Sequence, residues 1–394
     1  MFETVSTAPP DAILGLTEAF QQDSNPEKIN LSVGVYKDAE GKTPVLQCVK
    51  AAERRLIEDE ATKSYLGIDG LPEYRSHVAG LLFGERVPAE RLAVIQTPGG
   101  TGAVRLAADF VSSQFAGAKV WISNPTWANH QAIFQAAGLP IETYRYLNAQ
   151  RTGLDFEGLL ADLTSGPVAG DAVLLHACCH NPTGVDPTAE QWQQIAAVLK
   201  ERRLLPIIDF AYQGFGSGLE EDAAGLHTIL DHVGEALVCS SFSKNFGLYS
   251  ERVGALTLVA EQADAATAGR SQLKRLVRSN YSNPPRHGAS VVATVLADSA
   301  LTAQWHQELA EMRQRIAAMR QAFVTRMRDS GVERDFRFLL DQNGMFSFSG
   351  LNPMQVDELR SQHSVYIVGS GRINVAGMTE ENLPRLCEAI AAVL

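Results

Sequence analysis

One lysine lies in a segment whose neighbours would give it unusual chemistry. Lys244 follows an apolar run, Ala236–Cys239, that predicts a buried strand, and it precedes a second apolar run, Val253–Val259. An amine in apolar surroundings is poorly solvated, which favours its neutral form. Because a neutral amine can attack a carbonyl carbon, the segment predicts a lysine that forms a Schiff base.

Two further side chains of the same segment suit a phosphate group. Arg252 offers a fixed cationic fork and Ser241 offers a hydroxyl, and both groups bind that anion well. A lysine beside phosphate ligands indicates pyridoxal 5′-phosphate as the cofactor. The alternative is a solvated lysine and arginine that flank an ordinary loop.

A glycine-rich stretch, Thr97–Ala103, follows the predicted strand Leu92–Gln96 and precedes a helical pattern, Val104–Phe115. Backbone N–H groups at such a helix start bind anions, and the helix dipole adds to the attraction. The spacing matches neither a dinucleotide fingerprint nor a Walker loop. The stretch is therefore either an anion site or an empty turn into a helix.

Other strand ends carry polar or aromatic side chains. Trp127 follows one predicted strand and could stack on a flat ring, and Asn181 follows another, where its amide could bond a ring hydroxyl or a substrate carboxylate. Asp209 and Tyr212 close a third strand. A carboxylate that leaves an apolar strand needs a cation or a strong donor, and a protonated pyridine nitrogen would serve. The alternatives are a packing tryptophan, a turn asparagine and a helix-capping aspartate.

Histidines and cysteines gather near Asn181, but their spacing predicts no metal centre. Cys178, Cys179 and His180 are consecutive, and no second cluster completes a site. We expect His176 and His180 to be buried and hydrogen-bonded. Five cysteines, two of them adjacent, make a poor disulfide framework and indicate reduced thiols in a cytoplasm.

Apolar runs alternate with helical patterns from about Pro44 to Leu301. This alternation predicts an α/β fold with a largely parallel sheet that helices cover on both faces. In such a sheet the functional groups gather at the carboxyl ends of the strands, where the polar motifs fall. The predicted strands are Leu92–Gln96, Lys119–Ser123, Ala172–His176, Pro206–Asp209, Ala236–Ser241 and Val253–Val259.

The two ends of the chain predict a smaller α+β unit. We expect a large domain at residues 44–310 and a discontinuous small domain at residues 1–43 and 311–394. The expected elements include helices at Ala12–Gln21 and Trp305–Met327 and a short strand within Ile29–Tyr36 that ends near Gly34.

The composition is that of a soluble globular protein. Of 394 residues 45% are apolar and 20% charged, and the net charge of −11 argues against non-specific nucleic-acid binding. No apolar run approaches the length of a bilayer span, and Met1–Thr4 lack the pattern of a leader peptide. We therefore expect a cytoplasmic protein without nucleic-acid or membrane partners.

The motifs together resemble the class I pyridoxal-phosphate aminotransferases, specifically the aspartate and aromatic aminotransferase subfamily. The resemblance implies an aspartate aminotransferase-like fold, pyridoxal 5′-phosphate as cofactor and a homodimer with shared active sites. It implies a ping-pong transfer of the amino group of aspartate to 2-oxoglutarate. The similarity covers essentially the whole chain and is carried by Val33–Tyr36, Pro98–Ala103, Ser123–Trp127, His176–Gly184, Asp209–Phe215, Ser240–Gly254, Asn280–Pro285, Gly344–Gly350 and Gly371–Met378.

The resemblance also implies a role for each site residue. Lys244 would form the Schiff base and carry the proton between Cα and C4′, and Trp127 would stack on the ring. Asp209 would face the pyridine nitrogen with support from His130. The remaining cofactor-binding residues would be Tyr212 and Asn181 at the ring hydroxyl, Gly99, Gly100, Thr101, Ser241 and Arg252 around the phosphate, and Tyr65 from the neighbouring subunit.

Two arginines match the two carboxylates of a dicarboxylic substrate. Arg372 follows a glycine, and its planar fork suits the substrate α-carboxylate, with help from Gly34 and Asn181 by the resemblance. Arg278, donated across the dimer, would hold the distal carboxylate. A rigid turn at residues 279–285 could present it.

The substrate preference within the subfamily stays open. An aromatic-preferring enzyme is the alternative, because Ser64 departs from the asparagine that is common in the aspartate branch. A decarboxylase, lyase or racemase on the same cofactor is a further alternative, of which Arg372 disfavours the decarboxylase because it would fix the α-carboxylate. A non-catalytic binding protein is disfavoured by Lys244, Asp209 and both arginines. The residues that resemble the aspartate branch are Val35, Lys37, Thr43, Thr101 and Asn283.

Overall fold

The chain folds around a seven-stranded sheet with the strand order β2-β8-β7-β6-β5-β3-β4. A computed structural model describes residues 1–7 and 14–394. The strands from β7 to β4 run parallel, whereas β8 is antiparallel to both of its neighbours, so the prediction of a largely parallel sheet is confirmed. The strands of this sheet are β2 (Leu92–Pro98), β3 (Val120–Asn124), β4 (Ile141–Arg145), β5 (Ala172–His176), β6 (Leu205–Phe210), β7 (Ala236–Ser241) and β8 (Val253–Val259).

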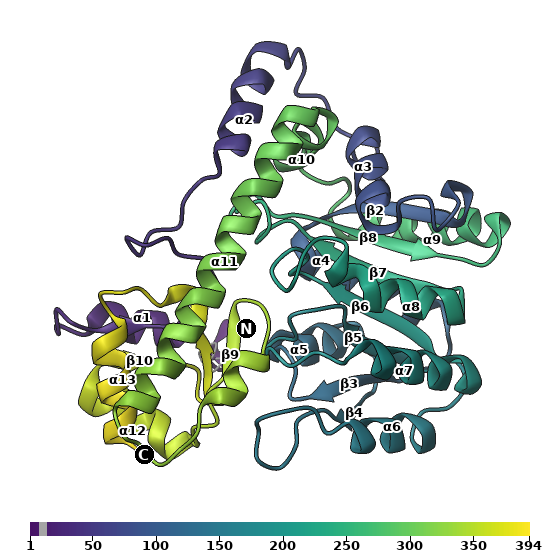
Figure 1. Cartoon of the computed structure of the whole chain (residues 1–394). Coiled ribbons are helices and arrows are strands. Elements are labelled where there is room, and N and C mark those ends of the chain that lie inside the picture. The colour runs from purple at the N-terminus through teal and green to yellow at the C-terminus, as the bar shows by residue number, and fades with distance from the viewer. Residues whose placement is uncertain (8–13) are drawn as a thin grey trace.

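Helices cover both faces of the sheet because successive strand residues point to opposite sides (Figure 1). Leu175 belongs to the core beneath α6, α7 and α8, whereas Leu174 belongs to the core beneath α4, α5 and α9. The helices are α1 (Leu14–Gln22), α2 (Gln47–Asp59), α3 (Pro72–Phe83), α4 (Gly99–Gln114), α5 (Ala128–Ala136), α6 (Phe156–Ser165), α7 (Ala189–Arg202), α8 (Ala224–Val233), α9 (Ala263–Asn280), α10 (His287–Ala297), α11 (Ser299–Asp329), α12 (Pro353–His363) and α13 (Leu383–Ala392).

The predicted strand ends are close to the observed ones, with one strand missed. The sequence pattern does not predict β4, because Tyr144 is the only buried residue of its five. This strand lies at the edge of the sheet, where an apolar run is not required. The sequence of β4 therefore lacks the continuous apolar run that predicts the central strands.

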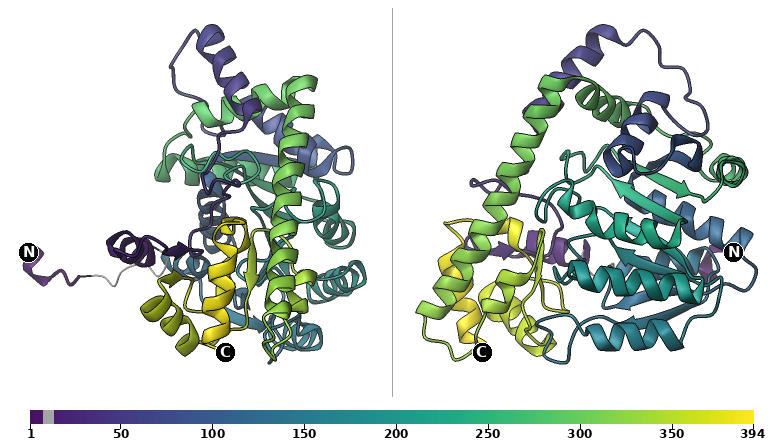
Figure 2. Two further views of the ribbon diagram at one scale, coloured as in Figure 1. Left: turned by 60° about the vertical axis from the view of Figure 1, so that its left-hand side comes forward. Right: turned by 45° about the vertical axis from the view of Figure 1, so that its right-hand side comes forward.

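The two ends of the chain meet in a smaller unit beside the large sheet (Figures 1 and 2). Strand β1 (Ile29–Asn30) pairs in parallel with β10 (Val365–Tyr366), and β11 (Arg372–Asn374) pairs antiparallel with β9 (Phe346–Phe348). The amino-terminal segment therefore packs against the carboxy-terminal one.

The strand predicted to end near Gly34 is wrong in extent, since β1 ends at Asn30. Leu31 still bonds the backbones of Tyr366 and Asn374, and beyond it a side chain also holds the segment. Asn374 Nδ2 donates to the carbonyl oxygens of Val33 at 2.7 Å and Val35 at 2.8 Å.

The long helix α11 joins the two units and is longer at both ends than predicted. Asp298 caps it by accepting hydrogen bonds from the N–H groups of Ala300 and Leu301. In the expected amino-terminal helix, Ala12 and Ile13 lie outside the described residues, and α1 begins at Leu14. No helix within residues 1–7 and 14–394 combines the length and apolar character needed to cross a bilayer.

Candidate active site

The predicted site residues converge on a cavity of about 240 Å³ at the carboxyl ends of the parallel strands. The cavity also meets the smaller unit through Arg372 and Gly34. The predicted residues Tyr65, Gly99 and Arg278 do not line it. The predicted residues that do line it are Gly34, Gly100, Thr101, Trp127, Asn181, Asp209, Tyr212, Ser241, Lys244, Arg252 and Arg372.

Lys244 lies in the loop after β7 and faces the cavity. Its Nζ atom is 4.8 Å from the centre of the Tyr212 ring. Burial lowers the pKa of Lys244 to about 8, with Asp209 opposing the change and the two arginines Arg252 and Arg372 adding to it. A much larger share of this amine than of an ordinary lysine is therefore neutral near physiological pH, as a nucleophile or a proton acceptor requires.

Asp209 ends β6 with a buried carboxylate that has histidine neighbours. Burial alone raises the pKa of Asp209, but the hydrogen bond with His130 and the nearby basic groups outweigh it, and the pKa lies below its ordinary value. Thr126 Oγ1 lies 2.9 Å from His130 Nδ1 and orients that ring. Asp209 thus stays ionised in an apolar place and can hold a cationic ring nitrogen.

Three side chains form a chain of hydrogen bonds across the cavity. Arg372 Nη1 donates to Asn181 Oδ1 at 3.4 Å, and Asn181 Nδ2 donates to Tyr212 Oη at the same distance. Burial raises the pKa of Tyr212 well above its ordinary value, although Arg372 opposes this. The phenol stays protonated and can donate to an oxygen in the cavity.

Arg372 is a buried cation without a counter-ion in the described chain. Its residue is 4% exposed, its Nε atom has no hydrogen-bond partner, and no carboxylate within residues 1–7 and 14–394 pairs with it. Burial lowers the pKa of Arg372 to about 10. Because an unpaired buried charge is costly, this guanidinium suits an anionic ligand in the cavity.

The glycine-rich stretch forms an anion cradle with Arg252. Helix α4 begins at Gly99, earlier than predicted, because the apolar periodicity that marks the helix starts only after the glycines. Gly99 has a φ of +74°, and a Cβ atom there would lie 2.5 Å from Arg252 Nη2. Glycine therefore lets the guanidinium lie against the helix start, where free N–H groups point outward.

Five cavity residues had no role predicted from the sequence: the apolar Val104 and Ala211, and three that make polar or ring contacts, Ser243, Tyr249 and Phe346. Ser243 lies 3.2 Å from Ser241 through their hydroxyl oxygens, and Tyr249 Oη accepts from the backbone N–H of Tyr36 at 2.9 Å. The Phe346 ring lies 4.2 Å beneath the Arg372 guanidinium. The only sequence signal of these last three was membership in the motifs that carry the family resemblance.

Phe346 also explains why residue 34 is a glycine. A Cβ atom at Gly34 would lie 2.9 Å from the Phe346 ring, closer than side chains normally approach. The backbone of the amino-terminal segment therefore reaches the cavity wall only without a side chain at this position.

Tyr65 lies in the loop after α2 and Arg278 in the last turn of α9, just before the loop that follows this helix, and both lie outside the cavity. Tyr65 is 91% exposed, and Arg278 is exposed and donates to Ser282 Oγ. Asn283 Nδ2 donates to the Leu66 carbonyl oxygen at 3.0 Å and joins the two loops. Both side chains are therefore presented on one part of the surface.

The prediction that both strand-end histidines are hydrogen-bonded is wrong for His176. His180 contacts the hydroxyls of Ser123 at 2.9 Å and Thr183 at 2.8 Å. His176 is also buried, but neither ring nitrogen has a hydrogen-bond partner in the described chain. The neighbouring carboxylate of Asp209 is too far for one, at 3.9 Å.

Two groups of side chains have the composition of metal ligands. His130, His176 and Asp209 converge at the cavity, and tertiary folding brings Asp222 to the adjacent Cys178 and Cys179. Asp222 already accepts hydrogen bonds from backbone N–H groups of residues 214–218. The expectation that the chain holds no metal stays a prediction.

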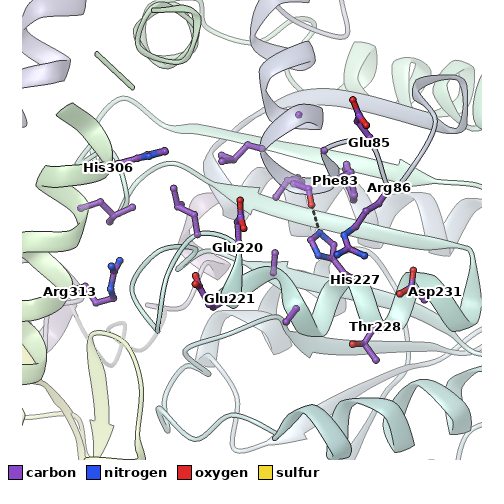
Figure 3. A pocket seen from close by; sticks show the side chains of 18 residues that line it. Phe83, Glu85, Arg86, Glu220, Glu221, His227, Thr228, Asp231, His306 and Arg313 are labelled. Carbon is purple, nitrogen blue, oxygen red and sulfur yellow. Dashed lines mark hydrogen bonds between the residues drawn. The ribbon is translucent and has the colours of Figure 1, made fainter. Parts of the chain in front are cut away.

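A larger hollow, of about 930 Å³, lies elsewhere between α3, α8 and α11 (Figure 3). Charged side chains such as Arg86, Glu220 and Asp231 border it, and His227 Nε2 donates to the Leu82 carbonyl oxygen at 2.8 Å. None of the predicted site residues lines it. The smaller cavity around Lys244 is therefore the candidate active site.

Comparison with known proteins gives consistent matches over the whole chain. The family model described as aminotransferase class I and II matches residues 26–390. The chain is 56% identical to aspartate aminotransferase of Salmonella typhi and 48% identical to aromatic-amino-acid aminotransferase of Escherichia coli (strain K12), with 100% of both chains covered in each case. The crystal structure of aromatic-amino-acid aminotransferase from Burkholderia pseudomallei covalently bound to pyridoxal phosphate is similar at a TM-score of 0.97 and 49% identity, covering 100% of this chain and 99% of that one.

Proposed function

The chain belongs to the class I and II aminotransferases, and from this premise we propose that it transfers the amino group of aspartate to 2-oxoglutarate. Relatives named aspartate aminotransferase, together with the resemblance of the motifs, support this substrate pair. The observation that carries the proposal is the buried Arg372, which has no carboxylate partner among the described residues and lies in the same cavity as Lys244. A carboxylate on Arg372 would leave the amino group of the substrate near the lysine.

We propose pyridoxal 5′-phosphate as the cofactor, and the cavity fits it. The helix start at Gly99, with Ser241 and Arg252, forms a cradle for a phosphate, and Asp209 is kept ionised for a ring nitrogen. Trp127 lines the same cavity and offers a flat face to the ring. Bound pyridoxal phosphate supplies an electron-withdrawing ring that stabilises the negative charge left at the substrate Cα.

Each of the remaining steps is assigned to residues of this chain. Arg372 and Asn181 orient the substrate α-carboxylate, which presents the Cα–H bond to Lys244. Neutral Lys244 would take the Cα proton at Nζ and return it to the cofactor carbon on the other side of the amino nitrogen. Tyr212, held by Asn181, would donate to the ring oxygen of the cofactor. A 2-oxo acid then takes up the amino group when the same steps run in reverse.

We propose a homodimer in which each subunit completes the site of the other. Tyr65, in the loop after α2, and Arg278, at the end of α9, lie outside the cavity of their own chain, although the resemblance assigns them to the phosphate and the distal carboxylate. Exposed tyrosine and arginine side chains are common at the centres of protein interfaces. A partner's copies of Tyr65 and Arg278 would supply the phenol and the guanidinium to the cavity.

The division into a large domain at residues 44–310 and a small one at residues 1–43 and 311–394 is also proposed. Along α11, Arg313 donates to the Gly214 carbonyl of the large unit, and Arg315 donates to the Met378 carbonyl of the small unit. The contacts of α11 therefore change from the large unit to the small unit within one turn of the helix. Movement of the small unit would bring Arg372 toward Lys244 and exclude water.

Aromatic amino acids are a second substrate class. Relatives named aromatic-amino-acid aminotransferase support it, and an Arg278 supplied from the partner subunit would swing aside to admit an aromatic ring. Steady-state kinetics with aspartate, tyrosine and phenylalanine against 2-oxoglutarate test the assignment. We expect the highest kcat/KM with aspartate. Faster turnover of both aromatic substrates would overturn the aspartate preference, and no turnover of any would overturn the function.

A further inference from the structure

Helix α11 is hydrogen-bonded to the loop that carries Lys244. Trp305 Nε1 donates to the Asn245 carbonyl oxygen at 2.7 Å, and both residues are buried. The carbonyl oxygen of Lys244 itself accepts from the Gly247 N–H at 3.0 Å. The carbonyl groups of Lys244 and Asn245 are therefore both fixed, the first by the loop itself and the second by α11.

Aromatic packing holds the same loop against α11. The Trp305 ring stacks on Phe246 with centroids 4.4 Å apart and an angle of 21° between the planes. Phe246 in turn meets Phe242 edge-on at 5.6 Å. These two phenylalanines flank Lys244 by two residues on either side, so the indole fixes the loop through side chains as well as backbone.

The loop after Asp209 meets the same junction. Asn245 Nδ2 donates to the Gln213 carbonyl oxygen at 3.3 Å, and Arg313 of α11 donates to the next carbonyl, that of Gly214, at 2.8 Å. Gln213 directly follows Tyr212. One helix therefore holds the loop of the reactive amine and the loop of the phenol.

We propose that Trp305 is a positioning residue that sets the place of Lys244 relative to Tyr212 and Arg372. The inference rests on the proposed role of Lys244. On the cavity side of the junction, Lys244 Nζ lies 4.8 Å from the Tyr212 ring. Toward its other end α11 holds the small unit, where Arg320 donates to the Gly344 carbonyl oxygen. The amine and the guanidinium are thus placed from a single helix.

Trp305 is not one of the α11 residues that border the surface hollow, so its proposed role does not involve that surface. His306 and Arg313 border the large hollow on the outside of the helix, as Figure 3 shows. Trp305 is fully buried and does not line that hollow. Its hydrogen bond can therefore be removed without changing the surface of the protein.

The test uses the holoenzyme with Trp305→Phe, which keeps an aromatic ring on Phe246 and removes the N–H donor. We expect kcat to fall about fivefold, the factor that one neutral hydrogen bond is worth, with KM for aspartate within about twofold. The pH midpoint of the visible absorbance band of the Lys244-bound cofactor should move by about 0.5 unit, because the surroundings of Nζ change.

Trp121→Phe is the matched control. Trp121 Nε1 donates to Asp171 Oδ2 at 3.1 Å in β3, away from the cavity, so this variant also loses one indole hydrogen bond. We expect both variants to melt at a lower temperature, but only Trp305→Phe to change kcat and the absorbance midpoint. A Trp305→Phe enzyme that melts earlier with unchanged kcat and midpoint would show a purely structural role and overturn the proposal.

A second variant covers the case in which Trp305→Phe does not fold or does not retain cofactor. Arg313→Met removes the other hydrogen bond of the junction from a partly exposed position and keeps the aliphatic stem. It should move the midpoint in the same direction, and an unchanged midpoint would overturn the proposal. A wild-type enzyme that is inactive on aspartate would instead refute the proposed function, while the absorbance titration would still test the position of Lys244.

Discussion

His130 Nε2 lies 3.1 Å from Asp209 Oδ2, which joins a buried imidazole on α5 to the buried carboxylate at the end of β6. This contact is the largest effect that lowers the pKa of Asp209 against the burial that raises it. A buried carboxylate that stays ionised is the group that a protonated ring nitrogen needs. Several properties of the protein should therefore depend on residues behind the cavity wall.

Replacing His130 with Phe should make cofactor binding more sensitive to acid. The folded-state pKa of Asp209 is depressed, so its contribution is present above the unfolded pKa and is lost as the pH falls through the folded value. Without the hydrogen bond that pKa rises, and the pH at which half of the cofactor is released should rise by about 1 unit. Absorbance of retained cofactor after gel filtration at a series of pH values measures this. An unchanged midpoint would contradict the link between the two residues.

Replacing Lys244 with Ala should abolish transamination while cofactor still binds through its phosphate and ring contacts. We expect kcat to fall by about 10⁴-fold or more, because both the nucleophile and the proton carrier are lost. Lys200→Ala, on the exposed face of α7, serves as the control and should keep full activity. Turnover close to wild type in the Lys244 variant would remove the lysine from the mechanism.

Replacing Arg372 with Lys should weaken substrate binding although the charge is kept. A lysine cannot reproduce the planar two-point contact with a carboxylate, so KM for aspartate should rise about 10-fold to 100-fold. Arg360→Lys, on the exposed α12, is the matched control and should leave KM unchanged. Equal KM values for the Arg372 variant and wild type would place the α-carboxylate elsewhere.

Replacing Arg278 with Ala should impair aspartate far more than phenylalanine. If Arg278 holds the distal carboxylate, kcat/KM for aspartate should fall about 10²-fold. The value for phenylalanine should change little, because this substrate has no distal carboxylate. Arg275→Ala, one turn away on α9 and also exposed, provides the comparison. Similar losses for both substrates would exclude Arg278 from side-chain recognition.

Replacing His176 with Gln should make the protein less sensitive to acid. Burial lowers the pKa of His176 to about 3, so between about pH 6.5 and 3 the unfolded chain gains a proton that the folded chain does not. Folding stability due to this residue is therefore complete above pH 6.5 and falls as the pH drops. Between pH 7.5 and pH 5, the free energy of unfolding measured with urea should fall by about 2 kcal/mol less in the variant than in the wild-type protein. Parallel losses in the two proteins would contradict the neutral, buried state of His176.

Six of the seven strands of the large sheet, and the side chains at their ends, could be predicted from the sequence. Apolar runs such as Ala172–His176, Ala236–Ser241 and Val253–Val259 match the observed strands at both ends. This works because a central strand must be apolar along its whole length. A mainly parallel sheet also brings carboxyl ends to one edge, so Asp209 and Lys244 fall together although they are 35 residues apart in the chain.

Only the tertiary structure decided the contacts that tune those side chains. The hydrogen bond from Arg372 to Asn181, the Phe346 ring beneath Arg372 and the Trp305 hydrogen bond to Asn245 join residues that are far apart in the chain. Local periodicity carries no information about such pairs, because they depend on how completed helices and strands pack against each other. For the same reason the sequence did not predict that β1 ends at Asn30 or that the Asn374 side chain binds the backbone of Val33 and Val35.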